Sequence, residues 1–583
     1  MNSNINREYL QSIISDTLPD GRILLEEGRK IGKTVNAGRS KFIRDSKYDN
    51  YVQYLIDKKN TDNIEISTNI GLATVKEQLE GIADLYNWSA ENNVYFHSPL
   101  VIPSINQGIP RAKRADAVDA TSYTMETFDD YKAFAELEGV ECLQCNQITF
   151  VPNAMENTLN CLKTGTAVFG SFDQIMWDFE GCDNHEEYVA DIVRCLGILS
   201  TKYDEGVVVN GYLDDGFSGY CGDCISYVAH ALLEKYIITD LCGVRYMVGF
   251  GNLITDGKYK AALLKALDDV LSSPEQPGII LYHAATVSQW DHDIHSNYGA
   301  SLEELLFMLL AERRYKTAAN MITVPITEKV CVPTLESIKN IMGATSRMLE
   351  KIKSFESVID FTEIDEMAEL MKAKGTEMFH NILDTLVEGG IDIKDPMQML
   401  MFMKNFNGGF FEEAFHPSAK NSDKLDLYYP TDLGLLTNKM IDDEMLSLKS
   451  KYTQKVLTGK KIVVGSADCH AYGVRYVKSI LQEMGAAVVD IGVDCSIPDL
   501  IDTAKEEGTR LIGISTHNGQ ALGLAEKFSK LVDVNEYTIF MGGTLNTILP
   551  SQSEPVDVSD MIKDMGILAT NNIEDSIKLL SEK

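Results

Sequence analysis

Short apolar runs alternate with longer amphipathic segments between about residue 60 and residue 330 of the chain. The runs are rich in Val and Ile, which predicts strands, while the segments between them repeat apolar residues at helical spacing. The pattern therefore predicts β–α units around a parallel sheet. Eight strands are expected, at Ile64–Ile70, Val94–Ile102, Val140–Ile148, Ala167–Phe172, Val207–Tyr212, Val244–Phe250, Gly278–Ala285 and Asn320–Ile326.

Helices are predicted between these strands, for example at Thr74–Tyr86, Glu187–Ser200, Ile225–Tyr236, Tyr259–Leu271 and Leu302–Arg314. Eight strand–helix alternations in about 260 residues match the length of a closed (β/α)8 TIM barrel. In such barrels the chemistry lies at the carboxyl ends of the strands, so the residues directly after each apolar run are the candidates for a site.

A helical and irregular region follows the barrel, and a second β–α series begins at Gly459. The acidic-polar stretch Ile441–Gln454 is typical of a connection between folded units. We therefore expect two domains, covering residues 1–455 and 456–583. Five apolar runs in the second domain predict a doubly wound sheet of the Rossmann-like, flavodoxin type, and they lie at Lys461–Gly465, Ala487–Ile491, Arg510–Ser515, Tyr537–Met541 and Gly566–Ala569.

A D-x-H-x-x-G motif stands where the first of these five strands ends, at Asp468, His470 and Gly473. Open α/β sheets bind ligands at this edge. A neutral imidazole is a good ligand for cobalt, and a carboxylate two residues earlier can hydrogen-bond its other ring nitrogen. The glycine lets the chain turn closely beside a bulky planar group.

The motif resembles that of the cobalamin-binding domains of coenzyme-B12-dependent mutases and methionine synthase. The resemblance implies that His470 is the axial ligand of cobalt and that Asp468 is its hydrogen-bond partner. The third strand ends in GIST, which places Ser515 where the family has a Ser, followed by Thr516. The family more often has a Leu at the position of His517, which is a departure.

The fourth strand ends in FMGGT, where Gly542 and Gly543 match the small pair that admits the nucleotide tail in this family. The first domain is similar to the large subunit of glutamate mutase, so the whole chain resembles that subunit fused ahead of the small one. The stretches with this similarity are Gly206–Gly219, Gly243–Gly251, Gly278–His283, Ala318–Thr334 and Ala414–Lys420.

This resemblance implies an isomerase that uses adenosylcobalamin for a 1,2-carbon-skeleton rearrangement. The cobalt–carbon bond breaks homolytically, the 5′-deoxyadenosyl radical takes a hydrogen from the substrate, and the hydrogen returns after migration. A closed barrel suits this chemistry because a reactive radical must be shielded from side reactions. Two alternatives stay open: a corrinoid methyltransferase, and a cobalamin-binding protein with a catalytically inactive barrel.

The matching substrate positions differ from those of glutamate mutases. That family holds the two substrate carboxylates with three arginines after the first three strands, because the guanidinium binds a carboxylate bidentately. The matching residues here are Asn69, Arg111 and Asn146, with Arg114 close to the one Arg retained. A desolvated, unpaired carboxylate loses roughly several kcal/mol. We therefore predict a small amino or carboxylic acid as substrate, and not glutamate.

Other catalytic candidates follow later strands. The family's catalytic Glu after the fourth strand is missing here, and Asp173 lies just beyond that place. Asp173, Asp214 and Asp215 lie near the ends of predicted strands, so each could hold an ammonium. His283 is expected to contact the substrate or the adenosyl group. Glu328 matches a Glu that contacts the adenosyl ribose.

The amino-acid composition excludes some classes of binding partner. The 583 residues include 53 Lys and Arg against 86 Asp and Glu, a formal net charge of −33. This charge repels nucleic acids and anionic membranes. No signal peptide and no apolar run of about 18 residues is found. We expect a cytoplasmic protein that acts on a small molecule, and the resemblance implies a homodimer.

The 11 Cys residues predict reduced thiols that are buried as small hydrophobes. Cys142 and Cys145 lie in a predicted strand and face opposite sides, so they do not suit one metal ion. A zinc or redox role is geometrically possible for Cys221 and Cys224. The acidic, His-containing segment 290–295 predicts a polar loop at the barrel mouth.

Overall fold

A computed structural model provides the structure of the chain. It describes residues 7–14, 17–116, 122–179, 181–182, 184–283, 293–328, 333–420, 425–467, 471–493, 495–516, 521–532, 536–547 and 556–583. The chain divides into two compact units, which are described separately. The first unit comprises Met1–Gly219, Asp223–Phe406 and Glu413–Asp432, and the second comprises Tyr220–Gly222, Asn407–Glu412 and Leu433–Lys583.

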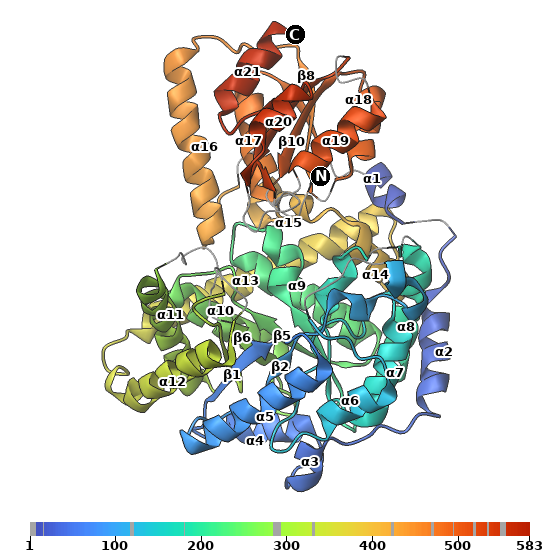
Figure 1. Cartoon of the computed structure of the whole chain (residues 1–583), viewed down its shortest axis with the longest axis vertical. Helices are drawn as coiled ribbons and strands as arrows, with labels where there is room; N and C mark the ends of the chain where they lie inside the picture. The colour runs from blue at the N-terminus through green and yellow to red at the C-terminus, as the bar shows by residue number, and fades with distance from the viewer. Residues whose placement is uncertain are drawn as a thin grey trace. The chain divides into compact units, whose positions relative to one another are not determined.

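The first unit is built on a parallel sheet of seven strands in the order β2-β1-β7-β6-β5-β4-β3. Side chains on both faces of the strands are buried, as expected where helices cover a parallel sheet. Figure 1 shows the helices of this unit arranged around its strands. The strands are β1 (Glu65–Ile70), β2 (Leu100–Val101), β3 (Val168–Phe169), β4 (Val208–Tyr212), β5 (Arg245–Phe250), β6 (Ile279–His283) and β7 (Asn320–Thr323).

Helices separate the strands along the chain, which confirms the predicted β–α alternation. The helices as far as Phe415 are α1 (Arg7–Ser12), α2 (Gly21–Gly32), α3 (Lys41–Asp45), α4 (Tyr51–Lys59), α5 (Val75–Glu91), α6 (Phe128–Ala135), α7 (Ala154–Thr164), α8 (His185–Ser200), α9 (Ile225–Lys235), α10 (Gly257–Leu271), α11 (Ile294–Tyr315), α12 (Leu335–Lys351), α13 (Phe361–Gly389), α14 (Pro396–Asn405) and α15 (Phe411–Phe415).

The predicted strand at Val140–Ile148 is reduced to single pairings. Leu143 forms a parallel bridge with Leu100 of β2, and Gln144 forms one with Phe169 of β3. This segment therefore lies between the two edge strands of the sheet. Regular pairing ends nearby because Gln147 has a positive φ of 58°, which is uncommon for a residue other than glycine.

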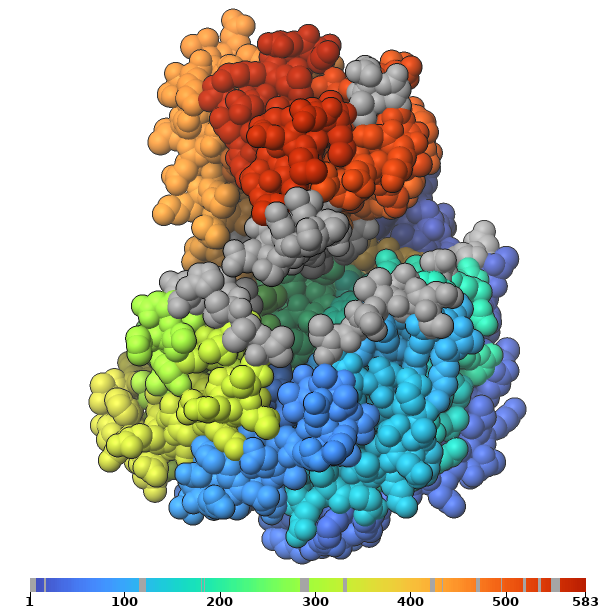
Figure 2. All heavy atoms as spheres, in the orientation of Figure 1, coloured from blue at the N-terminus to red at the C-terminus, as the bar shows by residue number. Residues whose placement is uncertain are grey.

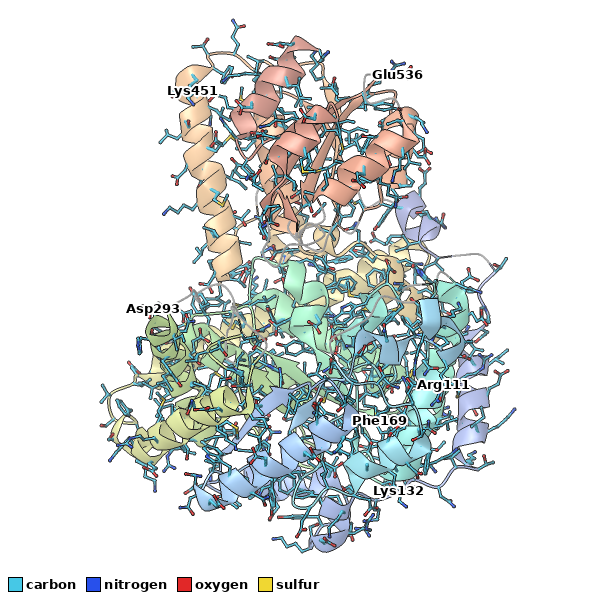
Figure 3. All side chains as sticks on the ribbon, in the orientation of Figure 1. Arg111, Lys132, Phe169, Asp293, Lys451 and Glu536 are labelled. Atoms are coloured by element: carbon cyan, nitrogen blue, oxygen red, sulfur yellow. The ribbon has the colours of Figure 1, made fainter. Side chains whose placement is uncertain are left out.

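Along the chain, β1 is the first strand of this sheet and β7 is the last, and the helices that follow them, α5 and α12, lie side by side. Lys339 of α12 donates to Asp84 of α5 over 2.6 Å, across 255 residues of sequence. The two helices adjoin on the face seen in Figure 2. In the side-chain view, Phe169 lies inside the unit, where it is fully buried, while Lys132 of α6 is exposed (Figure 3).

The second unit contains a parallel sheet of five strands in the order β14-β11-β10-β8-β9. Numbered within this unit, the order is 5-4-3-1-2, the flavodoxin-like arrangement that the sequence predicts. Its main strands are β8 (Lys461–Ser466), β9 (Ala487–Asp490), β10 (Leu511–Thr516), β11 (Thr538–Gly543) and β14 (Leu568–Ala569), and β12 (Asn546–Thr547) pairs with β13 (Val556–Asp557).

Apolar residues of this second sheet form a core on each face. Val463 and Ile512 belong to one core, and Ile462 and Val464 belong to the other, because side chains alternate along a strand. The stretch expected as a connection is mostly helical. The helices are α16 (Asp432–Lys451), α17 (Ala471–Glu483), α18 (Ile497–Glu506), α19 (Ala521–Leu531), α20 (Ser559–Asp564) and α21 (Ile573–Glu582).

None of the helices in the described part of the chain has the length and apolar character needed to span a membrane.

Candidate functional site

A cavity of about 420 Å³ opens at the carboxyl ends of the first unit's strands. This is where parallel α/β folds bind their ligands. Its walls combine amides, an imidazole and carboxylates with apolar side chains. The polar and aromatic lining residues are Asn69, Ser122, Asn146, Trp177, Asn210, Tyr212, Asp215, His283 and Glu328.

Four of the six barrel residues predicted to form the substrate site line this cavity: Asn69, Asn146, His283 and Glu328. They come from widely separated parts of the sequence, and the parallel sheet brings them together. Arg111 and Asp173 do not belong to the described lining.

His283 ends β6 and is nearly buried, with 3% of its surface exposed. Its Nδ1 lies 3.5 Å from Nδ2 of Asn69, and its ring centroid lies 4.6 Å from that of Tyr212. Burial lowers the pKa of His283 to about 3, and the charge of Lys260 acts in the same direction. The imidazole is therefore neutral near pH 7, so one ring nitrogen donates a hydrogen bond and the other accepts one.

Several polar atoms around the cavity have no hydrogen-bond partner among the described residues. They are Oδ1 of Asn69, Nε2 of His283 and both side-chain polar atoms of Asn210. Buried polar atoms are rarely left unpaired, since each one costs free energy of desolvation. A polar ligand in the cavity would satisfy them.

The ionisable groups of the lining are acidic. Burial raises the pKa of Glu328. Burial also raises the pKa of Asp215 well above its usual value, with further contributions from Asp173 and Asp214. No Lys or Arg occurs among the lining residues that the structure describes. The cavity is thus suited to a neutral or cationic group, because an ammonium would favour the ionised carboxylates.

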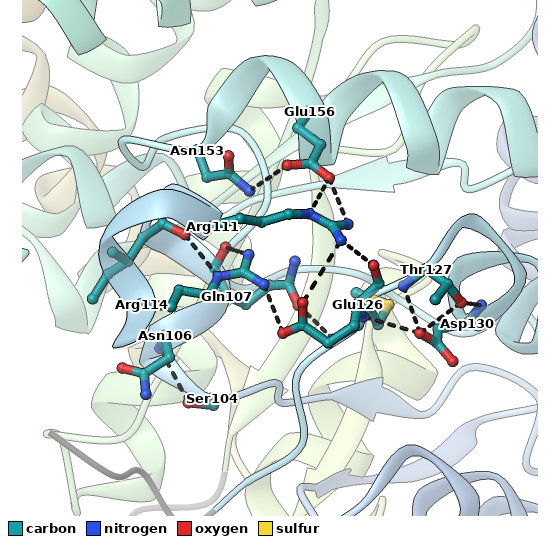
Figure 4. Close-up of polar contacts among 12 residues, drawn as sticks. Ser104, Asn106, Gln107, Arg111, Arg114, Glu126, Thr127, Asp130, Asn153 and Glu156 are labelled. Carbon is teal, nitrogen blue, oxygen red and sulfur yellow. Dashed lines mark hydrogen bonds and ion pairs between the residues drawn. The ribbon is translucent and has the colours of Figure 1, made fainter. Parts of the chain in front are cut away.

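Arg111 is engaged by its own chain in η2 (Arg111–Asp116), as Figure 4 shows. Its guanidinium lies 2.6 Å from Oε1 of Glu156 and donates to the carbonyl oxygen of Glu126. The Glu156 carboxylate raises the pKa of Arg111. The neighbouring Arg114 is also held, with Nη1 2.8 Å from Glu126. Arg111 would have to release these partners before it could bind a substrate carboxylate.

Asp173 lies behind the wall of the cavity, in η3 (Phe172–Met176), and is fully buried. Its Oδ2 accepts a 2.6 Å hydrogen bond from the backbone N–H of Tyr212, whose side chain lines the cavity. Burial raises the pKa of Asp173 well above its usual value, and the nearby Glu234 adds to the effect. Asp173 therefore positions the wall without belonging to it.

The Asp214 carboxylate is held by hydrogen bonds from its own chain. It accepts hydrogen bonds from the Tyr227 hydroxyl at 2.8 Å and from the backbone N–H of Gly251 at 2.7 Å. Burial raises its pKa in spite of these donors.

Sequence reasoning missed Asn210 as a lining residue. Asn210 and Tyr212 are two positions apart on β4, so their side chains point to the same face. That alternation, counted back from Tyr212 at the end of the predicted strand, was the signal that could have found Asn210.

The second unit brings together four of its predicted cofactor residues. Ser515 and Thr516 end β10 and pair with Gly542 and Gly543 at the end of β11. Thr516 is fully buried, and its Oγ1 has no hydrogen-bond partner among the described residues. Gly543 has φ +106°, and a Cβ there would lie 2.1 Å from the Thr516 carbonyl oxygen. This edge of the sheet consequently admits only small residues.

Gly473 lies in the first turn of α17. Asp468 and His470 lie outside the described residues, so their predicted roles remain predictions. The same holds for segment 290–292, while Asp293 caps α11. Cys142, Cys145, Cys221 and Cys224 are each buried. Within the described ranges, the side chains grouped closely enough to hold a metal ion are Asp173, His230 and Glu234.

Comparison with known proteins identifies the second unit. Residues 461–564 match the family described as the B12 binding domain. Over 113 residues the chain is 35% identical to the glutamate mutase sigma subunit of Clostridium tetanomorphum, covering 18% of this chain and 80% of that protein.

A comparison of structures finds the carboxyl transferase domain of Rhizobium etli pyruvate carboxylase, solved with pyruvate and biocytin. The TM-score is 0.30 at 10% identity, over 70% of this chain and 69% of the other. A TM-score of this size does not establish a common fold.

Proposed function

We propose a function from the premise that this chain, through residues 461–564, belongs to the B12-binding family that includes the glutamate mutase sigma subunit. The chain is proposed to be an adenosylcobalamin-dependent mutase that performs a 1,2-carbon-skeleton rearrangement. The substrate is proposed to be a small amino acid with an ammonium or amide group, and not glutamate.

The proposal depends on one observation: the same chain contains a B12-binding domain and, in its first unit, a polar cavity. The cavity contains unpartnered polar atoms of Asn69, Asn210 and His283. We also propose that the first unit is a closed (β/α)8 barrel, in which the bridged segment at Leu143 and Gln144 takes the place of the third strand. A closed barrel surrounds a reactive species on all sides.

The end of the second sheet fits a large ligand. Thr516 Oγ1 is buried without a partner in the described part of the chain, and Gly542 presents no side chain at the same edge. Ser515, Thr516, Gly542 and Gly543 would hold the nucleotide tail. His470 would bind the cobalt, with Asp468 as the hydrogen-bond partner of its imidazole. When bound, adenosylcobalamin supplies a carbon-centred radical by homolysis of its Co–C bond.

The residues of the cavity would bind and orient the substrate. Asn69 and His283 supply hydrogen bonds, with His283 neutral near pH 7. Glu328 and Asp215 would hold an ammonium, since a nearby positive charge favours ionised carboxylates whose burial favours the protonated form. A dicarboxylate would instead face these two acids with no cation among the described lining residues.

The test is an EPR panel. Purified full-length protein with adenosylcobalamin is mixed with small amino acids and carboxylic acids, glutamate included, and the spectra are searched for substrate-dependent radical signals. A signal with an amino acid other than glutamate supports the proposal. Conversion of glutamate to 3-methylaspartate at normal mutase rates would refute the substrate class.

The alternatives predict other outcomes of the same panel. A corrinoid methyltransferase would show methyl exchange without radical signals. A protein with an inactive barrel would bind cobalamin and give no radical with any compound. His470→Gly should lose tight cobalamin binding or activity, with Gly523→Ala as a control, because a Cβ at the exposed Gly523 meets nothing within 4 Å. Undiminished turnover in His470→Gly would refute the proposed ligand.

A further inference from the structure

Three ionisable side chains converge in the interior of the first unit, behind the cavity wall. Asp173 lies in η3, while His230 and Glu234 lie one turn apart on α9. Residues four apart on a helix share a face. All three side chains are fully buried, and one ligand atom of each lies within 4.8 Å of the others.

The distances among these atoms match those between ligands of one metal ion. Nε2 of His230 lies 2.9 Å from Oε1 of Glu234 and 3.4 Å from Oδ1 of Asp173. Ligand atoms at about 2.1 Å from a metal are about 3.0 Å apart at octahedral angles and about 3.4 Å apart at tetrahedral angles.

The atoms that face away from the centre have donors of their own. Oδ2 of Asp173 accepts from the backbone N–H of Tyr212 at 2.6 Å, and Oε2 of Glu234 accepts from the Tyr246 hydroxyl at 2.7 Å. Nδ1 of His230 lies 3.0 Å from Oγ of Ser218. A hydrogen bond on the second ring nitrogen is the usual way to orient a metal-binding imidazole.

The atoms that face the centre have only the His230 imidazole as a nearby donor, with Nε2 2.9 Å from Glu234 Oε1 and 3.4 Å from Asp173 Oδ1. Apart from that imidazole, neither oxygen has a hydrogen-bond partner among the described residues. No Lys or Arg in that part of the chain forms an ion pair with either carboxylate. Two carboxylates buried together in ionised form without a cation are strongly disfavoured.

Two backbone positions beside the cluster, Gly211 and Gly216, are glycines, and a side chain at either would clash with a carboxylate of the cluster. A Cβ at Gly211 would lie 1.9 Å from Glu234 Oε2, and a Cβ at Gly216 would lie 2.0 Å from Asp173 Oδ1. Glycine at both positions therefore leaves room for the Glu234 and Asp173 carboxylates.

We infer that Asp173, His230 and Glu234 bind a divalent metal ion of the zinc and manganese class. Two carboxylates and one imidazole suit such ions. The ion would link η3, α9 and the end of β4, and so hold Tyr212 at the cavity wall. It would not touch the substrate, and Asp173, expected from sequence as a catalytic residue, would act as a ligand and positioning residue.

The test uses the full-length, cobalamin-free protein, so that cobalt from the cofactor does not contribute. The protein is titrated with Zn²⁺ or Mn²⁺, dialysed, and analysed by inductively coupled plasma mass spectrometry. We expect about one equivalent of metal per chain in the wild type, and at least roughly 100-fold weaker binding in Glu234→Gln and His230→Gln. Glu141→Gln is the matched control, because Glu141 is a buried carboxylate outside the cluster.

Absence of bound Zn²⁺ and Mn²⁺ in the titrated wild type would overturn the inference, as would undiminished binding in both cluster variants. If circular dichroism shows that the variants do not fold, X-ray absorption at the metal edge of the wild type decides. A shell of nitrogen and oxygen at about 2.1 Å with imidazole scattering supports the site, whereas sulfur ligands or a shell without imidazole overturn it.

Discussion

Carboxyl groups have different surroundings in the two units of the chain. In the first unit, burial raises the pKa values of Glu141, Glu234 and Glu312, each to about 7. In the described part of the second unit, the shifted carboxyls have lowered values: Asp557 through a backbone N–H donor and Glu574 through lysine side chains. The first unit therefore holds several acids in a dry interior that raises their pKa values, whereas these two carboxyls of the second unit have donors that lower theirs.

The carboxyl ends of the strands also differ between the two sheets, in the size and polarity of their side chains. In the first unit, large polar side chains such as His283 and Tyr212 meet around a small cavity. In the second unit, Ser515, Gly542 and Gly543 leave an edge without bulk. The first arrangement presents charge and hydrogen-bonding groups around a small cavity, whereas the second presents almost no side-chain bulk.

The largest expected effect comes from a buried ion pair of the first unit. Lys260 lies 2.7 Å from Glu304, with 0% and 2% of the side chains exposed. Lys260→Met removes the cation from a buried carboxylate and should lower the free energy of unfolding by about 3–5 kcal/mol. All three Trp residues belong to the first unit, so their fluorescence in urea reports its unfolding.

The control for this prediction is Lys563→Ala in the second unit. Lys563 pairs with Asp560 over 3.3 Å, with 49% and 97% of the side chains exposed. Exposed pairs contribute little, so circular dichroism should detect no change. Equal effects of the two substitutions would contradict the difference drawn between the units.

Stability should fall with rising pH through Glu141, which accepts a hydrogen bond from Ser40. Its pKa rises from 4.5 to about 7 because of burial. Because the folded protein binds this proton more tightly, the contribution of protonated Glu141 to stability is fully present below pH 4.5. That contribution is lost as the pH rises through about 7. The loss is roughly 3 kcal/mol.

Glu141→Gln removes this titration, so the stability of the variant relative to the wild type should grow between pH 5 and pH 8 in fluorescence-monitored urea unfolding. Glu574→Gln in the second unit should leave that pH profile unchanged. A constant difference between Glu141→Gln and the wild type across this range would show that Glu141 does not titrate as expected.

Gly543→Val tests the edge of the second sheet. The new Cβ would lie 2.1 Å from the Thr516 carbonyl oxygen at a backbone φ of +106°. We expect the second unit to lose about 2–3 kcal/mol of stability, measured by circular dichroism, and cobalamin binding to be abolished, measured by absorbance. Gly523→Ala in α19 should bind normally. Normal cobalamin binding by Gly543→Val would mean that this edge does not hold the ligand.

Arg111→Ala should have the smallest effect. The Arg111 side chain is 41% exposed and pairs with Glu156, so its removal should change the free energy of unfolding by less than about 1 kcal/mol. Substrate kinetics then decide the sequence-based expectation: a tenfold or larger rise in KM would support binding of a substrate carboxylate by Arg111, and an unchanged KM would contradict it. Arg114→Ala is the comparison, since Arg114 is only 11% exposed.

The sequence predicted the parallel α/β architecture well, because apolar strand runs and amphipathic helices are local features. It overestimated Val94–Ile102, of which Leu100–Val101 forms the strand, since prolines such as Pro99 lack the N–H that a ladder needs. It also predicted a full strand at Val140–Ile148, where polar residues and the positive φ of Gln147 leave single bridges.

The candidate sites were predictable to different degrees. Ser515, Thr516, Gly542 and Gly543 lie within a few residues of their strand ends, so a local motif was enough to place them at one edge. The cavity draws on residues far apart in the sequence, among them Asn69 and Glu328, and only the tertiary fold determines which of them meet. Arg111 is the clearest case, because its partner Glu156 lies 45 residues away.

The sequence by itself determined the alternation of strands and helices and the small residues at the edge of the second sheet, and it provided the prediction that Asn69 and Asn146 stand where glutamate mutases have arginines. These depend on local backbone preferences and on residue identity. Only the tertiary structure decided that Arg111 is engaged elsewhere, that the described cavity lining holds acids and amides without a cation, and that Asp173 faces His230 and Glu234. Each of these depends on burial and on distances between residues far apart in the chain, which local pattern does not specify.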